Sequence, residues 1–220
     1  MRRMTRRMLA ALLAIFFLSG AVALGEANPY QSVLDMTLAG MTAAEEPAEV
    51  DEMKGFNRFT RTIARAEGTS GLDAVGYAFV DLDGDGVEEL IIGETAENEY
   101  MDGCVLDIWT QMQGVPVLAC RGWDRYRFYL VPDTETGKLA IFTEGSNSAF
   151  ESQYEYGIFQ NGTFVVQHLL VYNSEAANVW TLDGQPCEAA AAEAMLALWQ
   201  GAKLAPMLMP FTSLQTEKDE

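Results

Sequence analysis

The chain has 220 residues, of which 32 are acidic and 14 are basic, so its formal net charge at pH 7 is −18. This charge excludes nucleic acid as the expected partner, because nucleic-acid binding requires lysine and arginine to neutralise phosphates, and it disfavours tight binding to anionic lipid. Hydrophobic residues make up 49% of the chain, which is enough for one ordinary domain with a core.

Residues 1–27 predict a signal peptide for export. Four arginines precede an apolar stretch at 8–24, and small residues at 21–23 fit a cleavage site. The alternative is an uncleaved anchor helix, for which the stretch is short. Cleavage would leave 10 basic and 31 acidic residues, a net charge of about −21. We therefore expect a protein that is secreted or held in the cell envelope, with no stable membrane insertion after cleavage.

The region 28–70 predicts two helices. Asn28 and Pro29 are typical of a helix start, and apolar residues recur at helical spacing through 29–41. An acidic linker is expected at 45–49, followed by a second helix over 49–66. We expect this region to form a single domain with the β-rich region 71–220.

From residue 71 onward, the pattern changes to short strands separated by turn residues, with a final helix expected over 188–200. Asn161-Gly162 between two strand-like runs predicts a two-residue hairpin, and further turns are expected at Asp183-Gly184 and at 145–147. Leu208 and Phe211 predict a last short strand or an extended packing segment. The fold class is therefore α+β, with an antiparallel meander or curled sheet whose strands are expected at 75–80, 89–93, 104–110, 115–120, 126–131, 138–143, 153–159, 163–172 and 178–182.

The three cysteines are Cys104, Cys120 and Cys187, and an odd number makes a poor disulfide framework. Cys104 and Cys120 lie at the open ends of an expected hairpin, where opposed residues have the spacing that a disulfide needs. The sequence leaves this disulfide open, and it predicts a small buried apolar role for Cys187.

One loop carries the chemistry of a metal site. Calcium takes six to eight oxygen ligands, and a loop supplies them when acidic side chains alternate with spacers. Such carboxylates repel one another unless a cation neutralises them. Gly86 permits the sharp turn. The predicted ligands are Asp81, Asp83, Asp85, the backbone carbonyl of Val87, and Glu89.

The elements around this loop distinguish it from an EF-hand. Strands are expected on both sides of it, whereas an EF-hand has flanking helices and a glutamate at position 12, where this chain has Ile92. Residues 76–93 resemble the calcium loop of FG-GAP and VCBS proteins, which lies between two strands. The resemblance implies Ca²⁺ at the five ligands named above. Because the chain has one such loop rather than a series, a propeller and an adhesion role are not expected.

The wider chain resembles uncharacterised secreted proteins of gut clostridia that carry a single loop of this kind. The shared features are the strand Leu106–Thr110 and the glycine- and serine-rich turn Gly145–Ala149. This resemblance implies no known activity. The alternative for the loop itself is a solvated acidic turn without metal.

The usual parts of a catalytic site are missing from the sequence, so we predict a protein that is not an enzyme. His168 is the only histidine, and it lies in an apolar strand-like run that indicates a structural role. A hydrolase with an unrecognised pair of carboxylates remains an alternative, because acidic residues are abundant.

Two basic stretches and one tryptophan indicate a possible docking surface. Trp123 is the tryptophan expected to be most exposed, and Arg121 and Arg125 flank it. A protein or glycan partner is one interpretation, and pairing with the chain's own acidic surface is the other. The leading hypothesis is a secreted, non-catalytic calcium-binding structural or binding module, with a glycan- or cell-wall-binding protein as the alternative. Besides Arg121 and Arg125, the two basic stretches contain Lys54, Arg58, Arg61, Arg65 and Arg127.

Overall fold

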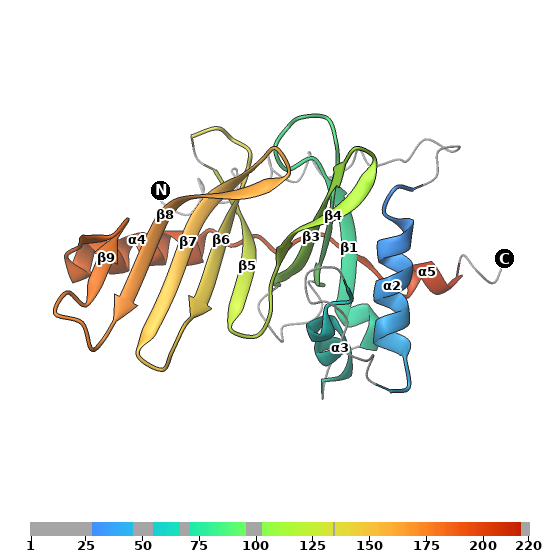
Figure 1. Cartoon of the computed structure of the whole chain (residues 1–220), viewed down its shortest axis with the longest axis horizontal. Helices are drawn as coiled ribbons and strands as arrows, with labels where there is room; N and C mark the ends of the chain where they lie inside the picture. The colour runs from blue at the N-terminus through green and yellow to red at the C-terminus, as the bar shows by residue number, and fades with distance from the viewer. Residues whose placement is uncertain (1–27, 46–54, 67–70, 96–102, 134, 217–220) are drawn as a thin grey trace, which may run out of the picture.

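The computed structural model describes residues 28–45, 55–66, 71–95, 103–133 and 135–216 (Figure 1). The expected signal peptide, most of the expected acidic linker and the first part of the expected second helix lie outside these residues. Within the described ranges, no helix is long and apolar enough to cross a membrane.

The two N-terminal helices are present but shorter than the periodicity predicts. Helix α2 spans Gln31–Thr42, and a turn precedes it in which Asn28 Oδ1 accepts the Tyr30 N–H at 2.9 Å. Helix α3 spans Arg58–Arg65, and its cap is Asn57, whose side chain accepts the Phe59 N–H. The C-terminal helix α4 spans Ala189–Gly201, close to the expected range. Two short helices were not predicted: the 3-10 helix η1 at Gly71–Ala74 and α5 at Ser213–Thr216.

Within the described residues, an antiparallel sheet of eleven strands forms the body of the protein, so the predicted α+β class is confirmed. The strands follow the order β10-β9-β8-β7-β6-β5-β3-β2-β1-β11, and β4 pairs with β3 beside this path. The bounds are β1 Val75–Val80, β2 Glu89–Glu94, β3 Val105–Met112, β4 Val115–Arg121, β5 Tyr126–Pro132, β6 Leu139–Ser146, β7 Glu151–Gln160, β8 Thr163–Asn173, β9 Trp180–Leu182, β10 Gln185–Pro186 and β11 Met209–Pro210.

Tight turns close the hairpins as the sequence predicts. Asn161 and Gly162 have φ angles of 50° and 71°, so both residues of this turn are left-handed, as a two-residue hairpin requires. The turns of the hairpins β3–β4 and β9–β10 also consist of two left-handed residues, Gln113–Gly114 and Asp183–Gly184.

Strand β3 divides the sheet into two parts because two strands share one of its edges. Val105 pairs with Phe128 of β5, whereas the residues from Asp107 onward pair with β4. Figure 1 shows the result: β1 to β4 lie beside α2 and α3, and β5 to β9 form a second group with α4 behind it.

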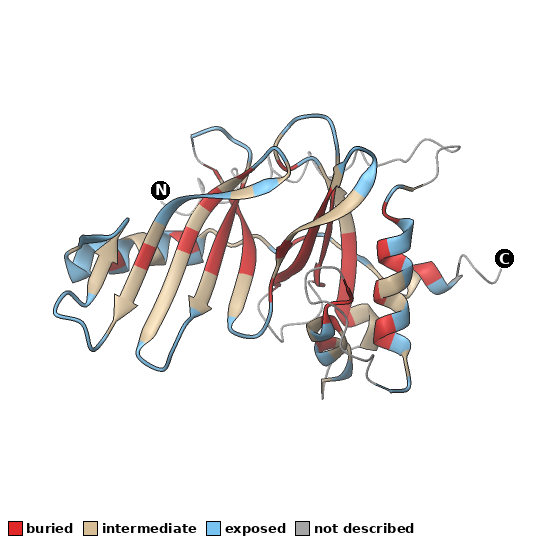
Figure 2. Ribbon diagram, in the orientation of Figure 1, coloured by how far each residue is buried: buried red, intermediate tan, exposed pale blue. Residues whose placement is uncertain are grey.

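Alternating residues of the strands enter two apolar clusters on opposite faces of the sheet. Figure 2 shows buried residues along the strands on both sides of the division at β3. The first cluster includes α2, α3 and α4, where Trp199 packs its ring against Phe142 and Tyr156 at centroid distances of 5.8 and 5.6 Å. The second cluster lies on the other face and includes Leu82, Ile108 and Phe159. Leu82 anchors the loop between β1 and β2 in this second cluster.

The possible Cys104–Cys120 disulfide is not formed. All three cysteines are free, and Cys120 of β4 pairs with Ile108 of β3. Cys104 belongs to the first apolar cluster and Cys120 to the second, so the two thiols lie on opposite faces of the sheet. Cys187 is half-buried against the first cluster rather than fully buried.

The prediction of a turn at 145–147 is also wrong in part, because β6 continues through Gly145 and Ser146. Gly145 lies opposite Tyr126, and a Cβ atom at this glycine would be 2.6 Å from the tyrosine ring. The glycine therefore makes room for an aromatic ring inside the sheet rather than starting a turn.

Candidate metal site

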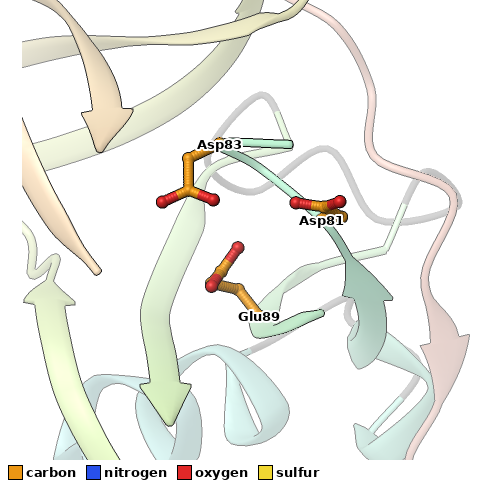
Figure 3. Close-up of side chains that lie close together, drawn as sticks. All are labelled: Asp81, Asp83 and Glu89. Atoms are coloured by element: carbon orange, nitrogen blue, oxygen red, sulfur yellow. The ribbon is translucent and has the colours of Figure 1, made fainter. Parts of the chain in front are cut away.

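The loop between β1 and β2 brings three of the predicted ligands together. Val80 and Glu89 are opposed in the register of the two strands, so the residues that follow Val80 lie next to the start of β2. Asp81, Asp83 and Glu89 each place a carboxylate oxygen within 4.8 Å of the others, and the side chains converge in Figure 3.

Asp81 organises the loop by accepting hydrogen bonds from its backbone. Its Oδ1 atom accepts the N–H groups of Gly84 at 2.7 Å and Asp85 at 3.1 Å, and its Oδ2 atom accepts the Gly86 N–H at 3.0 Å. Gly84 and Gly86 have φ angles of 75° and 88°, where a residue with a side chain is strained. The aspartate and the two glycines therefore fix the chain reversal that turns the carboxylates inward.

Glu89 is the buried member of the group, with 1% of its surface exposed. Its carboxylate accepts the Leu82 N–H at 2.9 Å and the Thr110 hydroxyl at 3.1 Å. The pKa of Glu89 is raised to about 7, mainly by burial and to a smaller extent by the negative charges of Asp83 and Asp85, against the lowering effect of the two hydrogen bonds. The protein therefore holds a buried carboxylate that a nearby positive charge would stabilise.

Two other elements hold the loop from outside. Tyr30, at the start of α2, donates its hydroxyl to the Glu88 carbonyl at 2.7 Å. Lys138 donates from Nζ to the Asp83 carbonyl at 2.7 Å, which ties the loop to the turn before β6. Burial raises the pKa of Tyr30 to about 12, so this phenol remains a neutral donor at physiological pH.

The remaining predicted ligands lie outside the group of three. The Asp85 carboxylate accepts the Val87 N–H at 2.7 Å and so caps the second half of the loop. Val87 itself is 37% exposed. The roles of Asp85 and of the Val87 carbonyl as ligands stay predictions.

This arrangement can hold a metal ion. Three carboxylates with oxygen atoms within 4.8 Å of one another repel unless a cation or protons neutralise them. All the contributing atoms are oxygens, which are the ligands that hard divalent cations prefer.

Sequence reasoning missed Thr110, Tyr30 and Lys138. Thr110 follows Trp109, which pairs with Leu90 in the β2–β3 register, so correct strand pairing would have placed the threonine beside Glu89. Tyr30 and Lys138 approach from distant parts of the chain, and no local pattern in the sequence identifies them.

The expected docking residues have different environments. Trp123 is 51% exposed, and Arg125 is also exposed. Arg121 instead forms an ion pair with buried Asp107 at 2.9 Å and donates to the Gly55 carbonyl. Two of the three residues are therefore open to a partner, and Arg121 is part of the fold.

Other basic side chains serve the protein's own structure. Arg61 and Arg65 donate to the Ala43 carbonyl at 2.8 and 2.7 Å, at the end of α2, where exposed carbonyls favour a cation. Arg127 lies 3.5 Å from the carboxylate of Asp124. Lys54 lies outside the described residues.

Comparisons with protein-family models, curated proteins and solved structures find no match to this chain. The similarity of residues 76–93 to the loops of FG-GAP and VCBS proteins therefore stays a prediction.

Proposed function

We propose that this chain is a secreted, non-catalytic module in which the β1–β2 loop binds one Ca²⁺ ion. Asp81, Asp83 and Glu89 would supply carboxylate oxygens, and Asp85 and the Val87 carbonyl would complete the shell. The observation that carries the proposal is the buried Glu89 carboxylate with two further carboxylates close to it. Calcium would remove the repulsion within this group and stabilise the loop.

The ligand chemistry favours calcium over other common metals. Zinc sites are built mainly from histidine and cysteine, and neither residue type belongs to this group. Magnesium demands near-ideal octahedral geometry and keeps several waters, whereas calcium accepts an irregular set of six to eight oxygens. A loop that combines carboxylates with a backbone carbonyl matches the calcium preference.

The expected stabilisation is modest. Extracellular calcium modules bind with Kd values down to about 0.1 mM, and at about 1 mM calcium this affinity adds about 1.4 kcal/mol to the free energy of unfolding. For a domain of this size, the melting temperature would rise by roughly 3–6 °C.

Thermal unfolding in EDTA and in millimolar calcium tests this proposal. The native protein is expected to melt at a higher temperature in calcium, and an Asp81→Asn/Asp83→Asn variant is expected to show no calcium effect. The control is Asp124→Asn, which removes an exposed carboxylate in the turn before β5. If the calcium effect were equal in all three proteins, the cation would act elsewhere than at this loop.

The environments of the candidate nucleophiles support a non-catalytic role. Burial raises the pKa of the Cys104 and Cys120 thiols to about 12, so neither is a thiolate near neutral pH. His168 lies on an exposed part of β8, where its Nδ1 atom is 3.1 Å from an oxygen of Asp183.

Export rests on the predicted signal peptide, and immunoblotting of culture medium and cell fractions would test it.

A further inference from the structure

A second group of interacting polar side chains lies at the end of the sheet opposite the metal loop. Strand β7 alternates, so Tyr154 and Tyr156 belong to the face that the first apolar cluster and α4 cover, whereas Glu151, Gln153 and Glu155 belong to the other face. In Figure 1, α4 lies behind these strands, so the viewer sees this second face.

Hydrogen bonds connect these side chains into a polar ladder, defined here as Asn147, Glu151, Gln153, Glu155 and Asn173. The Asn147 amide donates to Glu151 at 2.9 Å and to Gln153 at 3.1 Å, and Asn173 donates to Glu151 at 3.0 Å. Gln153 in turn donates to Glu155 at 2.6 Å. The ladder is therefore held in position by its own contacts.

Aromatic residues lie at the margin of the polar ladder. Tyr126 lies over Gly145 and donates its hydroxyl to Glu155. Trp123 is paired with Tyr126 across a short turn, so the two side chains share a face, and the indole is 51% exposed. The backbone of this turn is joined to β6, because the Ser146 N–H donates to the Arg125 carbonyl at 3.0 Å.

The chemistry of this surface selects a ligand rich in hydrogen-bond donors. Both amide hydrogens of Asn147 are engaged within the ladder, whereas the carboxylate of Glu151 accepts two bonds and has lone pairs left over. The surface thus offers acceptors and negative charge beside an exposed indole, and indole rings attract cations. In the neighbouring turn Asp124 pairs with Arg127 at 3.5 Å and Arg125 is exposed, so the negative charge of this surface lies on the ladder itself, at Glu151 and Glu155.

We propose that this surface binds an oligosaccharide of amino sugars whose amino groups are free. The sugar ring would pack on Trp123, its hydroxyl groups would donate to the ladder, and its ammonium groups would face Glu151 and the indole. The overall charge of −18 would attract such a cationic polymer and repel acidic ones. The inference goes beyond the calcium proposal and is independent of it, because the ladder lies away from the metal loop.

The test is isothermal titration of the purified protein, in EDTA, with a fully deacetylated glucosamine hexamer. We expect saturable binding that weakens at least tenfold in Trp123→Ala and several-fold in Glu151→Gln. The matched controls lie on α4, on the other side of the sheet: Leu198→Ala removes an exposed apolar side chain, and Glu193→Gln removes an exposed carboxylate. Both controls are expected to bind as the native protein does.

Two further ligands make the assignment specific. The fully N-acetylated hexamer is expected to bind at least tenfold more weakly, because it has no ammonium groups. A lysine hexamer, which has the charge without the sugar rings, is expected to bind more weakly as well. No binding of the deacetylated hexamer, unchanged binding in Trp123→Ala with an unchanged melting temperature, or equal binding of either comparison ligand would overturn the proposal.

Discussion

Two carboxylates in this protein have similar burial but different neighbours. Glu89 is 1% exposed and Glu155 is 8% exposed, and each accepts a hydrogen bond from a threonine hydroxyl at 3.1 Å. Around Glu89 the neighbouring side chains include two further carboxylates. Around Glu155 the donors are neutral: Tyr126, Thr143 and Gln153.

The difference shows how neighbouring groups determine what a buried carboxylate needs. Neutral donors satisfy the oxygens of Glu155, so this carboxylate fixes the side chains around it without a counter-ion. Burial makes the ionised form of Glu89 unfavourable, its carboxylate neighbours add to this effect, and the raised pKa of Glu89 expresses the cost. Of these two buried carboxylates, Glu89 is therefore the one that gains from binding a metal ion, and variants at the two positions should respond differently to calcium.

The largest expected effect is the pH dependence of stability without calcium. Glu89 has a pKa of about 7 in the folded protein and an ordinary value of 4.5, so the folded state retains the proton more strongly. The contribution of Glu89 to stability is therefore fully present below pH 4.5 and is lost as the pH rises through 7. A pKa shift of this size corresponds to about 3 kcal/mol in the free energy of unfolding.

Glu89→Gln isolates this effect because glutamine stays neutral at every pH. In EDTA, urea unfolding is expected to show equal stability of the variant and the native protein near pH 4, and a more stable variant at pH 8. A native protein that stays as stable as Glu89→Gln at pH 8 would show that the Glu89 charge costs nothing in the fold.

The next effect concerns Glu155. Glu155→Ala leaves the buried hydroxyl of Thr143 and the Tyr126 phenol without their acceptor, which costs about 2 kcal/mol. We expect the same loss in calcium and in EDTA, measured by urea unfolding. Glu155→Gln keeps an acceptor for the two hydroxyl groups and should cost less. A calcium-dependent loss at this position would break the distinction between the two carboxylates.

The smallest effect compares the two threonines. Thr110→Val and Thr143→Val each remove one hydroxyl donor to a buried carboxylate, at a cost of about 1 kcal/mol. The Thr110→Val variant is also expected to have altered calcium affinity, because its hydroxyl orients Glu89. The Thr143→Val variant should bind calcium as the native protein does, and calorimetric titration of both variants measures the difference. Equal calcium affinities in the two variants would show that Thr110 does not contribute to the metal site.

The sequence predicted those parts of the protein that depend on local patterns. Asn161-Gly162 specifies its hairpin because both residues tolerate positive φ angles. The alternation of Asp81 and Asp83 and the glycine at 86 likewise identify the loop without knowledge of the fold. The helix over 188–200 was likewise predicted, and α4 spans Ala189–Gly201.

The unpredicted parts depend on the register between distant strands. The contact between Thr110 and Glu89 requires β2 to pair with β3, and the contact between Tyr126 and Glu155 crosses β6. Cys104 and Cys120 illustrate the same limit, because the hairpin was predicted but its pairing of Cys120 with Ile108 was not. Contacts between side chains of distant strands can be predicted only when the pairing of every intervening strand is known.

Direct measurement of calcium binding tests the central claim most sharply. Equilibrium dialysis with radioactive calcium, at pH 8 and at concentrations up to a few millimolar, would give the number of ions bound by the native protein and by Glu89→Gln. The structure leads us to expect one ion per native chain, with binding weakened at least tenfold in the variant. Failure of the native protein to bind, or equal binding by Glu89→Gln, would contradict the assignment of the β1–β2 loop as a calcium site.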